Sequence, residues 1–213
     1  ANGGPIFIEP PICLKNDCIP PLTIAKATVS NGRISRPTTR IPLLFRIHFY
    51  HKQDSLNMER ICLFPGTFDP VTLGHTDIIN RALPLFDKII VGIGLNSAKE
   101  PMFSADQRLQ WIEEIYKNEP KVTGGVYEGL TVDYCRKIGA RFILRGIRYV
   151  SDFEYEKTIA DANRTLDKNL ETVFLTGEPK YTSVASTIVR DIIRNGGDAS
   201  YFLPDLVYQS LKK

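Results

Sequence analysis

The segment that decides the fold reads ICLFPGTFDPVTLGH, residues 61–75. It begins with the apolar run Ile61–Phe64, which is typical of a buried strand, and a Pro65-Gly66 turn comes next, before Gly74-His75 opens a stretch with helical spacing. A glycine allows the backbone to approach an anion closely, and the first turn of a helix offers unpaired amides. The segment therefore predicts a strand, a turn and a helix start that bind a phosphate, with His75 placed to donate to a phosphoryl oxygen.

The alternation of apolar runs and helical spacing continues along the rest of the chain. Further strands are predicted at 89–95, 122–127, 142–144 and 172–175. Between them, capping boxes are predicted at Ser104 with Gln107 and at Ser151 with Glu154. Five short strands alternating with helices predict an α/β fold, a single Rossmann-like domain whose five-stranded, mostly parallel sheet carries helices on both faces. Ligands of such sheets bind at the carboxyl ends of the strands, so the residues there are the candidates for chemistry.

The charge of the chain argues against a nucleic-acid partner. The 213 residues carry a net charge of +3, of which residues 1–57 contribute +4 and residues 58–213 contribute −1. A nucleic-acid footprint requires basic charge gathered on the globular part. No apolar run reaches the roughly 20 residues of a membrane helix, so no membrane partner is expected either.

Residues 1–57 differ in composition from residues 58–213. They hold seven prolines and no sustained helical or alternating pattern, and the first methionine of the chain is Met58. We expect this segment to be a disordered extension, or an artefact of the expressed sequence or of start-site choice. The domain is expected to occupy residues 58–213.

The four cysteines show no paired spacing that would suggest a metal site or a disulfide framework. They are Cys13, Cys18, Cys62 and Cys135, and the last two fall in a predicted core strand and a predicted core helix. Buried free thiols in a reducing compartment are the better interpretation, which favours a cytoplasmic protein.

Basic residues lie directly after two of the predicted strands. Lys99 lies in the loop after the second strand, and Arg145 and Arg148 flank Gly146 at the end of the fourth. Two guanidinium groups leaving one buried strand can both face a single cleft, where phosphate is the partner that suits their geometry. A solvated lysine, and surface ion pairs between the arginines and the acidic residues after them, are the alternatives.

Hydroxyl side chains gather after the fifth strand. The segment reads Tyr181-Thr182-Ser183-Val184-Ala185-Ser186-Thr187 and leads into a predicted helix. Such hydroxyls can be ordinary N-caps, or they can form a cradle in which side chains and free amides receive a triphosphate.

These motifs resemble a known group of enzymes. Thr72-Leu73-Gly74-His75 looks like the T/H-x-G-H signature of the nucleotidylyltransferase superfamily, and the string Pro65–Pro70 closely resembles the bacterial phosphopantetheine adenylyltransferases. The resemblance covers residues 60–213 and none of 1–57. It implies adenylyl transfer from ATP to 4′-phosphopantetheine, giving dephospho-coenzyme A and pyrophosphate in coenzyme A biosynthesis.

The resemblance also implies roles for individual residues. The residues implied to bind the acceptor are Thr67, Lys99, Thr131 and Arg145. Those implied to bind ATP are Thr67, Phe68, His75, Gly146, Ile147, Arg148, Glu156, Tyr181, Thr182, Ser183, Val184, Ala185, Ser186 and Thr187. The catalytic set is His75 as transition-state stabiliser, with Thr67, Lys99 and Arg148. The family usually has serine where this chain has Ala185, which puts a side-chain role at that position in doubt.

The expected cofactor and partners come from the same resemblance. Mg²⁺ is expected to be held mainly by the phosphates of ATP and by water, because no carboxylate cage is evident for a protein-bound metal. A homohexamer is implied, with coenzyme A as a feedback ligand. Two alternatives stay open: a relative that acts on nicotinamide mononucleotide or, with CTP, on a small phosphorylated alcohol, and a nucleotide-binding regulatory module without turnover.

Overall fold

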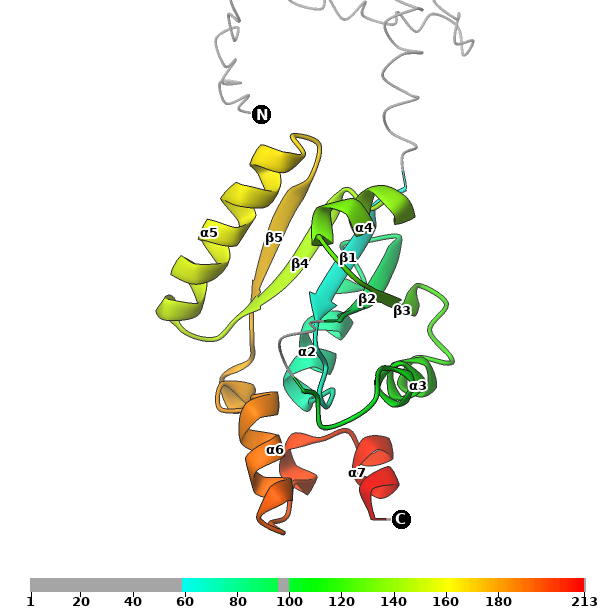
Figure 1. Ribbon diagram of the computed structural model, residues 1–213, viewed down its shortest axis with the longest axis vertical. Helices are drawn as coiled ribbons and strands as arrows, with labels where there is room; N and C mark the ends of the chain where they lie inside the picture. Colours follow the sequence, from blue (N-terminus) through cyan, green and yellow to red (C-terminus); the bar gives the residue numbers. More distant parts are fainter. Residues whose placement is uncertain (1–58, 96–99, 213) are drawn as a thin grey trace, which may run out of the picture. The chain divides into compact units, whose positions relative to one another are not determined.

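The computed structural model of the chain describes residues 59–95 and 100–212. The predicted boundary between residues 57 and 58, and the predicted disorder before it, lie outside these residues. Five strands form one sheet (Figure 1). They are β1 (Ile61–Gly66), β2 (Lys88–Gly94), β3 (Val122–Tyr127), β4 (Phe142–Ile147) and β5 (Glu171–Thr176). The helices are α2 (Leu73–Ala82), α3 (Ala105–Ile115), α4 (Thr131–Ile138), α5 (Val150–Leu166), α6 (Ser186–Arg194) and α7 (Asp205–Leu211).

The sheet confirms the predicted α/β class. Its order is β3-β2-β1-β4-β5, and each neighbouring pair is parallel. Alternate residues of a strand enter two different apolar clusters: Phe64 packs with residues of α2, α3, α6 and α7, whereas Leu63 packs with residues of α4. Both faces of the sheet are therefore covered, which explains why the strands read as continuous apolar runs.

The two central strands separate toward their carboxyl ends. β1 and β2 are in register over six residue pairs, but β1 and β4 pair only at Cys62 with Phe142 and at Leu63 with Ile143. The chain reverses its direction across the sheet at this same point, since β2 lies on one side of β1 and β4 on the other. Such a switch point leaves a crevice beyond the carboxyl ends of the two strands.

Several boundaries differ from the sequence prediction in an informative way. β1 continues through Pro65 and Gly66, which were predicted to form the turn, and β4 continues to Ile147. Ser104 caps α3 as predicted, with its side chain accepting from the amide of Gln107. The capping box predicted at Ser151 is wrong, because α5 already begins at Val150 and Tyr149 stands at the cap position.

Two further predictions concern the cysteines and the membrane. Cys62 and Cys135 are buried free thiols, as predicted, while Cys13 and Cys18 lie outside the described residues. Desolvation by burial is the largest cause that raises the pKa of each thiol, to about 12 for Cys135. Within the described part of the chain, every helix is too short or too polar to cross a membrane.

Candidate functional site

A cavity of about 1100 Å³ lies at the crevice between β1 and β4. Its wall includes most of the residues predicted to bind the two substrates. These are Thr67, Phe68, His75, Thr131, Arg145, Gly146, Ile147, Arg148, Glu156, Tyr181, Val184, Ala185, Ser186 and Thr187. Thr182 and Ser183 are described but are not part of this wall, and Lys99 lies outside the described residues. Residues from β1, β4, α4, α5 and the start of α6 thus meet at one site.

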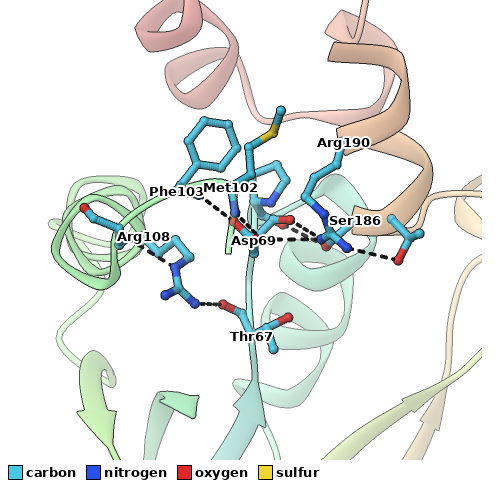
Figure 2. Close-up of polar contacts among 10 residues, drawn as sticks. Thr67, Asp69, Met102, Phe103, Arg108, Ser186 and Arg190 are labelled. Atoms are coloured by element: carbon cyan, nitrogen blue, oxygen red, sulfur yellow. Dashed lines mark hydrogen bonds and ion pairs between the residues drawn. The ribbon is translucent and has the colours of Figure 1, made fainter. Parts of the chain in front are cut away.

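The loop between β1 and α2 is held from two sides by arginines (Figure 2). From α3, Arg108, which is only 3% exposed, donates to the carbonyl of Thr67 at 2.7 Å. From α6, Arg190 donates to the carbonyl of Asp69 at 2.5 Å and lies 3.6 Å from its carboxylate. These contacts fix the backbone that carries Thr67 relative to the helices on either side.

The carboxylate of Asp69 also anchors the segment that precedes α3. Its two oxygens accept from the amides of Met102, at 3.0 Å, and Phe103, at 2.9 Å. Figure 2 shows Asp69 between this segment and Arg190. The carboxylate is 6% exposed, so its charge is compensated by the two amides and the guanidinium rather than by water.

The start of α6 faces the cavity with a different set of groups than the sequence suggested. The hydroxyl of Ser186 donates to the carbonyl of Pro70 at 2.9 Å, and the residue at the cap position is Ala185, which has no hydroxyl. Gly74 lies nearby, and a Cβ built there would meet the carbonyl of Val184 at 3.5 Å, which is ordinary contact. The neighbouring protein atoms therefore leave room for a Cβ at position 74. The space that the missing side chain leaves open is part of the cavity.

His75 has its ring fixed in one tautomer. The amide of Thr72 donates to Nδ1 at 3.0 Å, and an amide is always a donor, so Nδ1 carries no hydrogen. Burial is the largest cause that lowers the pKa of His75, to about 4, with the positive charges of Arg148 and Arg145 adding to it. The ring is therefore neutral at pH 7, and its single N–H is on Nε2.

The ring of Phe68 packs against the ring of His75. Its ring packs edge-to-face on His75 with 4.9 Å between the centroids, and on Phe64 with 5.4 Å. Phe68 has a positive φ of 48°, which is uncommon for a residue with a side chain and persists where the surroundings hold it in place. Phe68 is only 1% exposed as a whole residue, so it contributes to the site mainly by packing under its neighbours.

Each arginine of β4 and its following turn is paired with a carboxylate of α5. Nε of Arg145 donates to Glu156 at 2.7 Å and Nη2 donates to the other oxygen of the same carboxylate, while Nη1 donates to the carbonyl of Pro65 at 2.6 Å. Nε of Arg148 donates to Asp152 at 3.2 Å. The ion pairs that the sequence offered as an alternative therefore exist, and they lie inside the cavity wall.

Several residues of the site were given no role from the sequence. In the cavity wall these are Tyr127, Asp152, Tyr155, Ile159 and Asn163, and behind it Asp69, Arg108 and Arg190. Asp152 is one of the acidic residues that follow the two arginines in sequence, so its residue type was a usable signal. Arg108 and Arg190 act over 41 and 121 residues of sequence, and no local spacing predicts such contacts.

The described residues contain no group of three or more His, Cys, Asp or Glu side chains that could hold a metal ion. Both carboxylate oxygens of Asp69 already accept hydrogen bonds, and Asp152 and Glu156 are paired with arginines. The donors of the cavity instead suit anionic oxygens: guanidinium groups, a neutral imidazole N–H and the amides of a helix start.

Comparisons with known proteins identify the group to which this site belongs. The cytidylyltransferase-like family matches residues 63–192. The phosphopantetheine adenylyltransferase of Flavobacterium psychrophilum is 54% identical over 148 residues, which cover 70% of this chain and 97% of the relative. That of Flavobacterium johnsoniae is 52% identical over the same shares. The chain belongs to the phosphopantetheine adenylyltransferase family.

The solved structures support the fold. A protein from Vibrio parahaemolyticus, provisionally described as a nicotinate-nucleotide adenylyltransferase, matches with a TM-score of 0.57 and 19% identity, over 73% of this chain and all of that one. Similarity at that level shows a Rossmann-like fold and does not identify an activity or a substrate. Membership of the family confirms the resemblance read from the sequence and the prediction of a nucleotidyltransferase.

Proposed function

We propose that the chain transfers adenylyl from ATP to 4′-phosphopantetheine and releases dephospho-coenzyme A and pyrophosphate. The observation that supports this most directly is the grouping of two arginines, a neutral histidine and a helix start around one cavity, in a chain of this family. The acceptor phosphate is already a nucleophile at neutral pH. The protein therefore has to align two anions that repel each other and to stabilise charge at the α-phosphorus.

The acceptor is proposed to lie against Arg145, Thr67 and Thr131, with Lys99 completing its phosphate site. Arg145 presents its guanidinium where β1 and β4 part. The hydroxyl of Thr131, at the start of α4, forms a hydrogen bond of 3.0 Å with the hydroxyl of Tyr127. Lys99 comes after β2 in the sequence and keeps the role that the family resemblance implies.

ATP is proposed to lie toward Arg148 and the start of α6. Arg148 would receive the β- and γ-phosphates together with the amides of the first turn of α6, which have no partner within the helix. Mg²⁺ bound to ATP would neutralise charge on the triphosphate, with phosphate oxygens and water as its ligands. The other residues predicted to contact ATP are Phe68 after β1, Gly146 and Ile147 at the end of β4, Glu156 of α5, and Tyr181, Thr182, Ser183 and Val184 before α6.

His75 is proposed to stabilise the transition state. Its neutral ring offers one donor, Nε2–H, because Nδ1 is occupied by the amide of Thr72. A neutral donor strengthens as negative charge grows on an α-phosphoryl oxygen, and it needs no proton transfer. Loss of one such donor costs about 3 kcal/mol, or about a hundredfold in kcat. The attacking and leaving oxygens both belong to phosphates, so no covalent enzyme intermediate forms.

Assembly, location and regulation are proposed from the same family relationship. Large apolar side chains are exposed along the start of α5, with Tyr149 at 51%, Val150 at 77% and Tyr155 at 69%, and their burial would suit the packing of copies in a homohexamer. The free thiols Cys62 and Cys135 agree with the reducing cytoplasm. Coenzyme A carries the pantetheine arm of the acceptor and would compete for its side of the cavity.

Pyrophosphate release from ATP tests the proposed function. The acceptors to compare are 4′-phosphopantetheine, nicotinamide mononucleotide and, with CTP in place of ATP, a small phosphorylated alcohol. Turnover restricted to 4′-phosphopantetheine is expected. Faster release with another acceptor would reassign the substrate, and nucleotide binding without release of pyrophosphate with any acceptor would favour a regulatory module.

A further inference from the structure

The peptide that joins Thr67 to Phe68 is shared by two parts of the site. Thr67 is exposed and belongs to the cavity wall, and its hydroxyl is proposed to bind the phosphate of the acceptor. The ring of Phe68 packs on the ring of His75 with 4.9 Å between the centroids. Movement of this one peptide would therefore displace both the hydroxyl of Thr67 and the ring that packs against the histidine.

The backbone at Phe68 is strained. Its φ of 48° brings the Cβ atom close to the following carbonyl oxygen, and such a conformation persists only where the surroundings impose it. A flip of the Thr67–Phe68 peptide would bring this φ into the ordinary negative range, and it would also point the carbonyl of Thr67 in the opposite direction. A partner bound to that carbonyl therefore opposes the flip.

Arg108 is that partner (Figure 2). Its Nη1 donates to the carbonyl of Thr67 at 2.7 Å. Its Nε donates to the carbonyl of Ser104 at 3.2 Å, at the start of the same helix, so the guanidinium is held on α3 as well as on the loop. A hydrogen bond from a charged donor is roughly twice as strong as one between neutral groups. The bond to Thr67 is of this stronger kind, and it ties the strained peptide to a helix.

The surroundings of Arg108 are unfavourable for a charged group. The residue is 3% exposed, and within the described part of the chain its hydrogen bonds go to two neutral carbonyls. Desolvation by burial is the largest cause that acts on the pKa of Arg108 and lowers it, while the negative charge of Asp69 acts in the opposite direction. An apolar side chain of similar length would avoid the cost of burying this charge, which indicates that the guanidinium serves the loop rather than the packing of α3.

We propose that Arg108 is a positioning residue for the transfer reaction, which holds the Thr67–Phe68 peptide in its strained orientation and so fixes the hydroxyl of Thr67 relative to the ring of His75. Arg108 is not part of the cavity wall that the described residues form, so it acts through the loop and not by contact with a substrate. The inference rests on the proposed function, because it assigns a step in the placement of that reaction's substrates.

The test compares three variants of the full chain: Arg108→Met, Arg108→Lys and Ile112→Ala. Methionine keeps much of the length of the side chain but removes the donors, and lysine keeps the charge and can still donate. Ile112 is a fully buried residue of the same helix that faces β3, since a Cβ built at Gly124 would meet its Cγ2 at 3.7 Å. Its truncation therefore loosens α3 on the sheet and serves as the control for lost packing.

Two properties are measured for each variant. One is turnover, as kcat and KM for ATP and 4′-phosphopantetheine, assayed at the same interval below each variant's own melting temperature. The other needs no substrate: it is the position of the ring signals of His75 in the magnetic resonance spectrum of histidine-labelled protein. These signals depend on the neighbouring ring of Phe68, which lies edge-to-face on the histidine.

Arg108→Met is expected to lower kcat/KM for 4′-phosphopantetheine about tenfold to a hundredfold, which is the effect of a small misplacement of a group that orients a substrate. It should also shift the ring signals of His75. Arg108→Lys should recover part of both effects, and Ile112→Ala should leave both close to wild type. Added to Thr67→Val, Arg108→Met should lower kcat/KM by less than it does alone, because the hydroxyl that it positions is already gone.

Four results would overturn the proposal. They are a kcat/KM of Arg108→Met within about twofold of wild type, an equal loss in Ile112→Ala, full additivity with Thr67→Val, and unshifted signals of His75. If Arg108→Met does not fold, Arg108→Lys carries the same comparisons with a smaller expected loss. Wild-type protein that does not adenylate 4′-phosphopantetheine would contradict the proposed function, and the signals of His75 would still decide whether Arg108 holds the loop.

Discussion

Acidification from pH 7 to pH 5 should leave about nine-tenths of His75 uncharged in the substrate-free protein, because its pKa is lowered to about 4. An exposed histidine with a pKa of about 6.5 is half protonated at pH 6.5. With its pKa lowered to about 4, His75 would be protonated in only about 0.3% of molecules at that pH. The causes are burial first and then the charges of Arg148 and Arg145, so Arg148→Gln should raise the pKa of His75.

Nuclear magnetic resonance of histidine-labelled protein measures this directly. The chain has three histidines, His48, His51 and His75, and the signal of His75 is assigned as the one that disappears in His75→Gln. Nitrogen shifts should show a bare Nδ1 and a protonated Nε2, because the amide of Thr72 donates to Nδ1 at 3.0 Å. A titration of His75 near pH 6.5, or a proton on Nδ1, would refute the reasoning.

The same shift predicts a contribution to stability with a definite sign. His75 binds fewer protons in the folded than in the unfolded protein between pH 4 and pH 6.5. The free energy of unfolding should therefore rise with pH across that range and gain nothing further from this group above it. Denaturant titrations of wild type and His75→Gln at pH 5 and pH 7 compare the two slopes, and the variant should lack this component.

Three further predictions concern charges around the cavity and the first part of the chain. Lys99→Ala and Arg145→Ala should mainly raise the KM of the acceptor, and Arg148→Ala should mainly raise the KM of ATP, each by a factor equivalent to roughly 1.5–3 kcal/mol of binding free energy. Steady-state kinetics with both substrates check this, and an equal rise in both KM values in all three variants would contradict it. Arg190→Met should cost about 3 kcal/mol of stability in denaturant unfolding, because the buried carboxylate of Asp69 loses its cationic partner and keeps only two amide donors. Arg190→Lys should recover most of this loss; equal losses in the two variants would exclude the charge as the cause. Deletion of residues 1–57 should leave turnover unchanged and lower the melting temperature by less than about 4 °C in calorimetry; a larger fall would make the segment structural.

Much of the site could be predicted because the rules that place it are local or topological. The apolar periodicity that predicts each strand depends on neighbouring residues, and the five predicted strands are the five observed in the described part of the chain. Parallel strands bring their carboxyl ends to one edge, so Thr67 and Arg145 could be placed together although they lie far apart in sequence. Gly139 follows the last residue of α4 with a left-handed φ of 71°, a conformation that glycine accepts without strain.

The parts that could not be predicted depend on contacts between distant side chains. The capping box at Ser151 failed because the helix begins one residue earlier, and Asp152 accepts from the amide of Arg148 at 3.3 Å instead. Arg108 and Arg190 can bind the loop after β1 only because α3 and α6 pack beside it. The periodicity of the sequence does not specify that packing. Pairing of each cavity arginine with a particular carboxylate likewise depends on how α5 lies on the sheet.

The departure from the family at Ala185 can be understood from the contacts of its neighbour. A serine at that position would offer a hydroxyl, but the hydroxyl of the next residue, Ser186, donates to the carbonyl of Pro70 and ties α6 to the loop after β1. A side chain that holds two elements together is not free to follow a phosphate during reaction. For the proposed triphosphate site, α6 still offers the amides of its first turn and the hydroxyl of Thr187. Because amides belong to the backbone, the exchange of serine for alanine at 185 leaves this part of the cradle in place.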